Sequence, residues 1–165
     1  MTAQPQGEQS ASASAMWRDC LTFRLRNEEY GIDLLCVREI RTYERPNWIA
    51  GAPDYLPGVL NMRGDIVPIM DLRLRFGLEA EFSAHTVTIV VNISGVTAGL
   101  VVDSVSDVLQ LSAEQIKAAP DFRSTVDARF VTRLGLVRED QRERTLILLD
   151  VERLLASAQE AGRLN

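Results

Sequence analysis

The sequence has few of the residues that build catalytic and metal sites. Its 165 residues include one histidine, His85, and two cysteines, Cys20 and Cys36, which lack a CxxC spacing. These side chains are too few for a zinc site, and histidine is also the commonest acid–base catalyst. A disulfide between the two cysteines and a pair of reduced, half-buried thiols are the alternatives. Reduced thiols are the expected state in a cytoplasmic protein.

Other absences exclude whole classes of protein. No apolar run approaches the roughly 20 residues of a membrane-spanning helix, so no direct membrane insertion is expected. The net charge of −5 disfavours nucleic acid as a partner. The chain contains no GxxxxGKS/T loop, no GxGxxG after a strand and no GxSxG turn. The sequence therefore predicts a binding module that is not an enzyme and carries no cofactor.

The composition is that of one globular domain. Hydrophobic residues make up 46% of the chain and charged residues 25%, a balance that excludes a wholly disordered chain. Residues 1–15 are mainly Gln, Ser, Ala and Gly, so they are predicted to form a disordered tail rather than a signal peptide. We expect one domain over 17–160, with two lobes, in a protein that stays in the cytoplasm.

Short apolar segments at strand period predict an all-β fold of nine or ten strands and one terminal helix, arranged as two small barrels. Gly64 is expected to supply a positive φ in the turn at 61–64, and Pro68 indicates an edge strand or a bulge. Asp150 is expected to cap a helix over 151–161. The segments predicted as strands are 17–25, 30–34, 37–43, 58–60, 66–71, 86–93, 96–102, 105–111, 130–137 and 145–149.

Five aspartates and His85 could each have either a functional role, as metal ligands or a phosphoacceptor, or a purely structural role. Five aspartates could on paper form a magnesium site, but each lies at or beside a predicted turn, where Asp bonds local backbone amides. These aspartates are Asp54, Asp65, Asp71, Asp103 and Asp107. His85 lies just before a strand, whereas a phosphoacceptor histidine is expected on an exposed helix beside acidic residues. Turn chemistry and a surface-loop histidine are the favoured interpretations.

Two features could carry binding. The segment 37–43 alternates, with Val37, Glu39 and Arg41 on one side and Ile40 on the other. It is either an exposed edge strand that pairs with a partner or an internal strand with charged ends. Arg63, at the tip of the turn at 61–64, is either a solvated side chain or a binding hot spot.

Several segments together resemble the CheW family of bacterial chemotaxis coupling proteins. They occur in the family's order and cover essentially all of residues 17–156. The segments are EYGID at 29–33, VREI at 37–40, PGVLNMRGDIVPIMDL at 57–72, GLVVDSVSDVL at 99–109, and LILLDV at 146–151 followed by Leu154 and Leu155. Met62, in place of a common Leu, and a charged loop expected at 138–144 are departures from the family pattern.

The resemblance implies a fold and a function. The family fold is two SH3-like five-stranded β-barrels, here with a C-terminal helix. Its members are non-catalytic scaffolds that couple the cytoplasmic tips of methyl-accepting chemotaxis receptors to the regulatory domain of the CheA histidine kinase. The protein is then expected in the cytoplasm, recruited to membrane receptor arrays. The alternatives are coupling in a chemotaxis-like pathway with another output, and binding of a small ligand such as a purine.

The resemblance also implies two sets of binding residues. The residues implied to bind the kinase are Val37, Glu39, Ile40 and Arg41. Those implied to line a groove for the receptor tip are Asn61, Arg63, Val105 and Val108.

Overall fold

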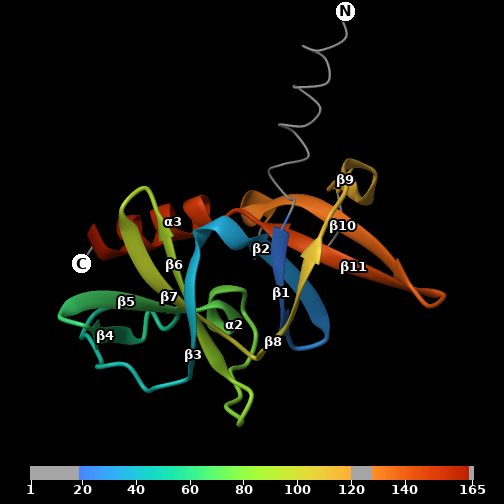
Figure 1. The fold of residues 1–165 in the computed structure, drawn as a ribbon. Coiled ribbons are helices and arrows are strands. Elements are labelled where there is room, and N and C mark those ends of the chain that lie inside the picture. Colours follow the sequence, from blue (N-terminus) through green and yellow to red (C-terminus); the bar gives the residue numbers. More distant parts are fainter. Residues whose placement is uncertain (1–18, 120–127, 164–165) are drawn as a thin grey trace, which may run out of the picture.

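The strands of the computed structural model form two sheets, one of six strands and one of five (Figure 1). The model describes residues 19–119 and 128–163. The first sheet, in the order β8-β1-β2-β11-β10-β9, contains β1 (Asp19–Leu25), β2 (Glu28–Asp33), β8 (Ser104–Gln110), β9 (Ile116–Ala118), β10 (Val131–Glu139) and β11 (Arg142–Leu149). The second, in the order β3-β6-β7-β5-β4, contains β3 (Val37–Thr42), β4 (Gly58–Met62), β5 (Asp65–Asp71), β6 (Val87–Ile93) and β7 (Val96–Val102).

Helices connect and cover these sheets. They are the short helix α2 (Leu72–Arg75), the terminal helix α3 (Val151–Arg163) and the 3₁₀ turns η1 (Leu34–Cys36), η2 (Ala113–Gln115) and η3 (Ala128–Phe130). Asp150 accepts a hydrogen bond from the Arg153 amide at 3.1 Å, so the predicted cap of the last helix is confirmed.

The predicted all-β fold with two lobes and a terminal helix is confirmed, with one difference. The first sheet has six strands rather than five. The first sheet also combines β1 and β2 with the later strands β8 to β11, which are joined by parallel pairing of β2 with β11. The predicted tail at 1–15 lies outside the described residues.

The buried residues form three clusters. The largest contains residues of both sheets and of α3, such as Phe23, Ile89 and Leu154, so the two lobes share one core. A smaller cluster around Leu146 belongs to the first sheet, and another around Leu60 belongs to the second. The largest cluster therefore joins the two lobes.

Local sequence explains the turns, with two corrections. Arg63 (φ 54°) and Gly64 (φ 90°) form the two-residue turn between β4 and β5, as predicted for the glycine. Pro68 lies in an internal strand rather than an edge strand, although it pairs only with β4 because pairing of β5 with β7 begins at Ile69. The charged loop expected at 138–144 is mostly strand, because a turn at Asp140 and Gln141 closes the β10–β11 hairpin.

A buried arginine joins the two sheets where the chain crosses between them. Arg73 is fully buried, and its guanidinium lies 2.8 Å from carboxylate oxygens of both Asp71 and Asp103. Asp103, between β7 and β8, also accepts a hydrogen bond from the Arg26 amide at 2.6 Å. Asp71 bonds the Arg73 amide, as the turn interpretation predicts, but the ion pairs with Arg73 were not anticipated.

Candidate functional site

β3 is an edge strand. It pairs with β6 alone, so the edge interpretation of 37–43 is correct and the internal-strand alternative is wrong. The other edge of β3 presents backbone donors and acceptors that no strand of its sheet uses. Such an edge is suited to pairing with another chain.

A β-bulge in β3 changes which side chains share a face. Val37 pairs with Val91 and Glu39 with Val90, so Arg38 is an extra residue in β3. The expectation that Val37 faces the same side as Glu39 is therefore wrong. Val37 packs on the shared core, and Ile40, which is 45% exposed, pairs with a residue of that core.

The opposite face of β3 is charged. Glu39 lies 3.7 Å from Arg41 and 3.4 Å from Arg63, which extends from the β4–β5 turn. Asn61 holds this turn, because its side-chain oxygen accepts a hydrogen bond from the Gly64 amide at 3.0 Å. The turn tip and the β3 edge are thus adjacent, although β3 and β4 lie at opposite edges of the sheet order. The sheet curls so that its two edges approach, as the predicted barrel requires.

β8 is the corresponding edge strand of the first sheet, and it also contains a bulge. Val108 pairs with Leu21 and Val105 with Phe23, so β8 has two residues where β1 has only Thr22. In a regular strand residues three apart point to opposite faces. Here both valines lie opposite residues of the shared core, and Val108 is 51% exposed.

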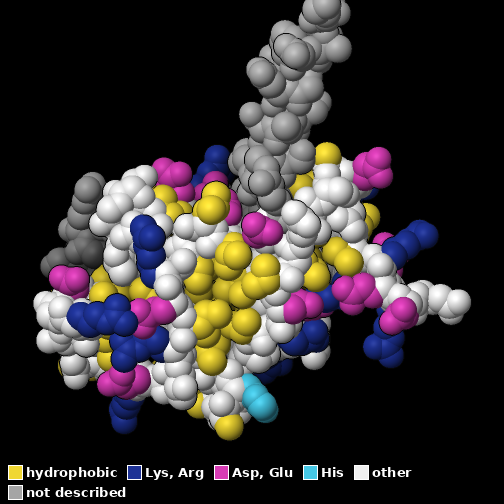
Figure 2. All heavy atoms as spheres, in the orientation of Figure 1, with side chains coloured by type: hydrophobic (Ala, Val, Ile, Leu, Met, Phe, Trp, Pro, Cys, Tyr) yellow, Lys and Arg dark blue, Asp and Glu magenta, His cyan; other side chains and the backbone are white. Residues whose placement is uncertain are grey.

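The two bulged edges together present an apolar surface. We call it the interlobe surface, formed by Val37, Ile40, Val105 and Val108. Figure 2 shows hydrophobic side chains gathered in the region between β3 and β8 of Figure 1, with charged side chains beside them on the side of β4 and β5. Arg63 lies next to Glu39, and within the described part of the chain no ion pair or hydrogen bond joins it to β8.

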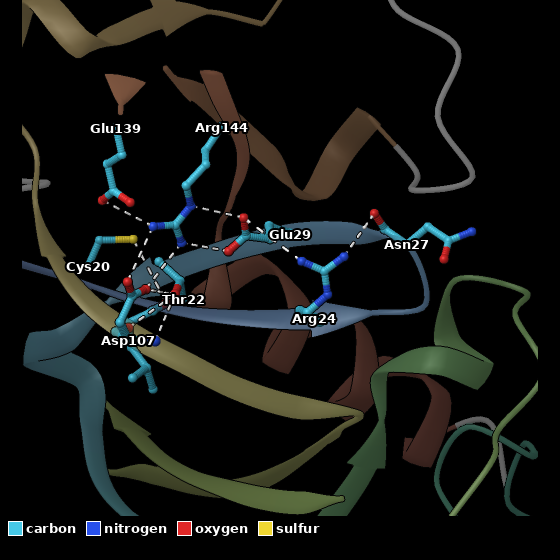
Figure 3. A network of polar contacts seen from close by, with 9 residues as sticks. Cys20, Thr22, Arg24, Asn27, Glu29, Asp107, Glu139 and Arg144 are labelled. Carbon is cyan, nitrogen blue, oxygen red and sulfur yellow. Dashed lines mark hydrogen bonds and ion pairs between the residues drawn. The ribbon is translucent and has the colours of Figure 1, made fainter. Parts of the chain in front are cut away.

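A polar network lies on the other face of the first sheet (Figure 3). Arg144 of β11 lies 2.7 Å from Glu29 and 3.2 Å from Asp107 of β8. Hydrogen bonds to Glu29 and Asp107 raise the pKa of Arg144, and the bond from Arg144 lowers the pKa of Asp107. Sequence reasoning missed this role of Arg144 because 138–144 was interpreted as a loop.

Within residues 19–119 and 128–163, the cysteines, the histidine and the metal-ligating side chains form no catalytic or metal site. Cys20 and Cys36 are free thiols, and burial raises the pKa of each to about 12, so both are protonated at neutral pH. They are buried rather than half-buried as predicted. His85 is exposed before β6, in agreement with the surface-loop interpretation. Within residues 19–119 and 128–163 no three metal-ligating side chains come together.

Comparison with known proteins decides the family. The protein-family model of the CheW-like domain matches residues 19–159 of this chain. The chain belongs to the CheW family. The chemotaxis protein CheW of Klebsiella aerogenes is 48% identical over 145 residues, which cover 87% of this chain and 85% of that protein. CheW of Rhizobium meliloti is 34% identical, with coverage of 81% and 85%.

A solved structure agrees with this CheW assignment. The crystal structure of the scaffolding protein TtCheW from Thermoanaerobacter tengcongensis matches with a TM-score of 0.72 and 30% identity, and covers 81% of this chain and 88% of that one. The protein is accordingly a non-catalytic chemotaxis scaffold of the CheW family. No helix in the described part of the chain is long and apolar enough to cross a membrane.

Proposed function

We propose that this CheW-family scaffold couples the cytoplasmic tips of methyl-accepting chemotaxis receptors to the regulatory domain of a CheA-type histidine kinase. The observation that supports this best is the pair of bulged edge strands, β3 and β8. Each carries an apolar pair three residues apart, and each has an edge that no strand of its own sheet occupies. A scaffold that joins two partners needs two such surfaces.

The kinase docks on the β3 edge through Val37, Glu39, Ile40 and Arg41. An exposed isoleucine beside a carboxylate and a guanidinium gives an apolar contact with a polar rim, the usual anatomy of a protein interface. The receptor tip contacts Asn61, Arg63, Val105 and Val108. The two surfaces share a boundary, because Glu39 and Arg63 form an ion pair and the apolar pairs of β3 and β8 lie opposite the same core.

This proposed function implies a protein in the cytoplasm, held at membrane receptor arrays by its partners. A fluorescent fusion is expected to collect in clusters where receptors are present and to spread evenly in a strain without receptors. Clusters that persist without receptors would contradict recruitment.

Reconstitution tests the coupling directly. Vesicles carrying a chemotaxis receptor are mixed with the purified scaffold and a CheA-type kinase and then sedimented. The kinase is expected to sediment and to be activated only when the scaffold is present, and the Ile40→Arg variant is expected to sediment without the kinase. If the scaffold neither sediments with receptor vesicles nor retains the kinase, the proposed function is wrong.

A further inference from the structure

The bulge in β8 determines which way the proposed receptor-binding valines point. Between the pairs Val105–Phe23 and Val108–Leu21, β8 contains Ser106 and Asp107, whereas β1 contains Thr22 alone. The extra residue leaves backbone groups that the regular strand ladder does not use. A bulge therefore needs other partners for these groups.

Thr22 supplies those partners. Its side chain is fully buried, and its hydroxyl accepts a hydrogen bond from the Asp107 amide and donates to the Asp107 carbonyl, both at 3.1 Å. The hydroxyl also contacts the Asp107 carboxylate. One side chain of β1 thus binds both backbone groups of the bulged residue.

Arg144 holds the same residue through its carboxylate. Two nitrogens of the guanidinium each lie 3.2 Å from one oxygen of Asp107, and two bonds to Glu29, at 2.7 and 3.0 Å, fix the other side of the fork. In the sheet order β8-β1-β2-β11, Arg144 therefore spans from β11 across to the edge strand (Figure 3). Paired, two-point contacts of this kind fix orientation as well as distance.

We propose that Thr22, Asp107 and Arg144 are positioning residues that hold the β8 bulge, and so turn Val105 and Val108 to the same face for the receptor. This inference rests on the proposed function, because it assigns a purpose to the orientation of two residues proposed to contact the receptor. The three residues lie on the opposite face of the sheet and act through β8 without touching the partner.

The sharpest test is Thr22→Val, which removes the hydroxyl at nearly constant volume, compared with Thr22→Ser, which keeps it. Exchange of the Asp107 amide, measured by NMR, reports the bulge, and the register of β8 against β1, with Val105 opposite Phe23 and Val108 opposite Leu21, is followed by NMR contacts between the two strands. In Thr22→Val we expect the Asp107 amide to exchange about tenfold faster and receptor-tip affinity to fall about five- to tenfold, the effect of about one lost hydrogen bond. Affinity for the kinase regulatory domain should change less than about twofold, and Thr22→Ser should resemble the parent.

A second pair of variants covers the case in which Thr22→Val fails to fold. Arg144→Met removes the two-point contact with Asp107, whereas Arg142→Met removes an exposed arginine from the same strand. Only the first is expected to accelerate exchange of the Asp107 amide and weaken receptor binding. A general loss of structure would instead lower kinase and receptor affinity together.

The outcomes separate this inference from the proposed function. If the exchange of the Asp107 amide and the register of β8 against β1 are unchanged in Thr22→Val and Arg144→Met, these residues do not hold the bulge and the inference is wrong. If Val108→Asp weakens receptor binding but loss of the bulge does not, the inference alone fails. If Val105→Asp and Val108→Asp both leave receptor affinity unchanged, the proposed receptor surface on β8 fails, and the positioning role fails with it.

Discussion

The guanidinium of Arg63 lies 3.4 Å from the carboxylate of Glu39 and joins the β4–β5 turn to the β3 edge. The family resemblance implies different partners for the two residues, the kinase for Glu39 and the receptor for Arg63. The ion pair shows that the assigned surfaces touch. A partner that takes Glu39 away from Arg63 frees the arginine for a second acceptor, so binding at the two surfaces is expected to be coupled.

Arg63→His is expected to reduce receptor coupling more than kinase binding. Arg63 is 87% exposed and has a φ of 54°, a conformation that histidine tolerates, so stability should change by less than about 0.5 kcal/mol. Histidine cannot reproduce the planar fork of donors. Loss of the exposed ion pair with Glu39, worth about 0–1 kcal/mol, should change kinase affinity by no more than about fivefold. Calorimetric titration with each partner measures the two affinities.

Arg63→Lys is the matched control, since it keeps the charge but not the fork. It should retain the contact with Glu39 and lose part of the receptor affinity. A fall of many degrees in the melting temperature of Arg63→His, or loss of both partners together, would instead make Arg63 a structural residue.

Ile40→Arg and Glu39→Lys are each expected to weaken kinase binding while the fold stays intact. Ile40 is 45% exposed on an edge strand, and Glu39 makes only exposed or partly exposed ion pairs, so neither change disturbs the core. Residues at the centre of an interface contribute about 2–4 kcal/mol, which is about 30- to 1,000-fold in affinity. Titration of the kinase regulatory domain, with Glu44→Lys as an exposed control beside Arg41, measures the effect.

Full thermal stability together with unchanged kinase affinity would remove both residues from the interface. A large loss of stability would show instead that β3 is part of the packed core rather than a docking edge.

Local signals in the sequence predicted the hairpins and the last helix, because turn residues and strand period are short-range properties, but they left the segment 37–43 open between an edge strand and an internal strand. They did not predict the bulges. A one-residue insertion at Arg38 or near Asp107 leaves the apolar pattern almost unchanged while it reverses the facing of every residue beyond it. Val37 was therefore placed on the wrong side of β3.

Contacts between residues far apart in the chain could not be predicted from the sequence either. Arg144 bonds Glu29, 115 positions earlier in the chain, and Arg73 bonds Asp103 across the crossover between the sheets. A charged run such as 138–144 looks like a solvated loop until the pairing of β11 with β2 is known. Asp107 was considered for turn chemistry for the same reason, since its partners lie on other strands.

Arg73→Met is expected to destabilise the protein strongly. The substitution leaves the Asp71 carboxylate buried without its cation, and breaking a buried ion pair costs about 3–5 kcal/mol. Arg26→Gln is the control, because Arg26 and Glu79 are exposed and their pair contributes about 0–1 kcal/mol. Urea unfolding measures both. Equal, small losses would mean that Arg73 is not the cation that holds the crossover.

The isolated chain is expected to take up no phosphoryl group. Incubation with an active CheA-type kinase and labelled ATP should leave it unlabelled, because His85 lies in an exposed connection before β6 rather than on a helix, with its amide bonded to the Ser83 hydroxyl. The His85→Ala variant should behave identically in receptor–kinase coupling. Label that disappears in His85→Ala would contradict the scaffold role.

The two thiols are expected to be inert in the folded protein and to make it less stable in alkali. Burial raises the pKa of Cys20 and Cys36 from 9.0 to about 12, so the unfolded chain releases these protons near pH 9 while the folded chain keeps them. Their contribution to stability is complete below pH 9 and is lost as pH rises towards 12, at about 1.4 kcal/mol per pH unit for each thiol.

Urea unfolding between pH 9 and 11 should show that the free energy of unfolding declines less steeply with pH in Cys20→Ala than in the parent, whatever the loss at neutral pH. A thiol reagent at pH 8 should label both cysteines only in denaturant. Rapid labelling of the folded protein would show that the thiols are accessible, and equal slopes for Cys20→Ala and the parent would show that burial does not raise the pKa of Cys20.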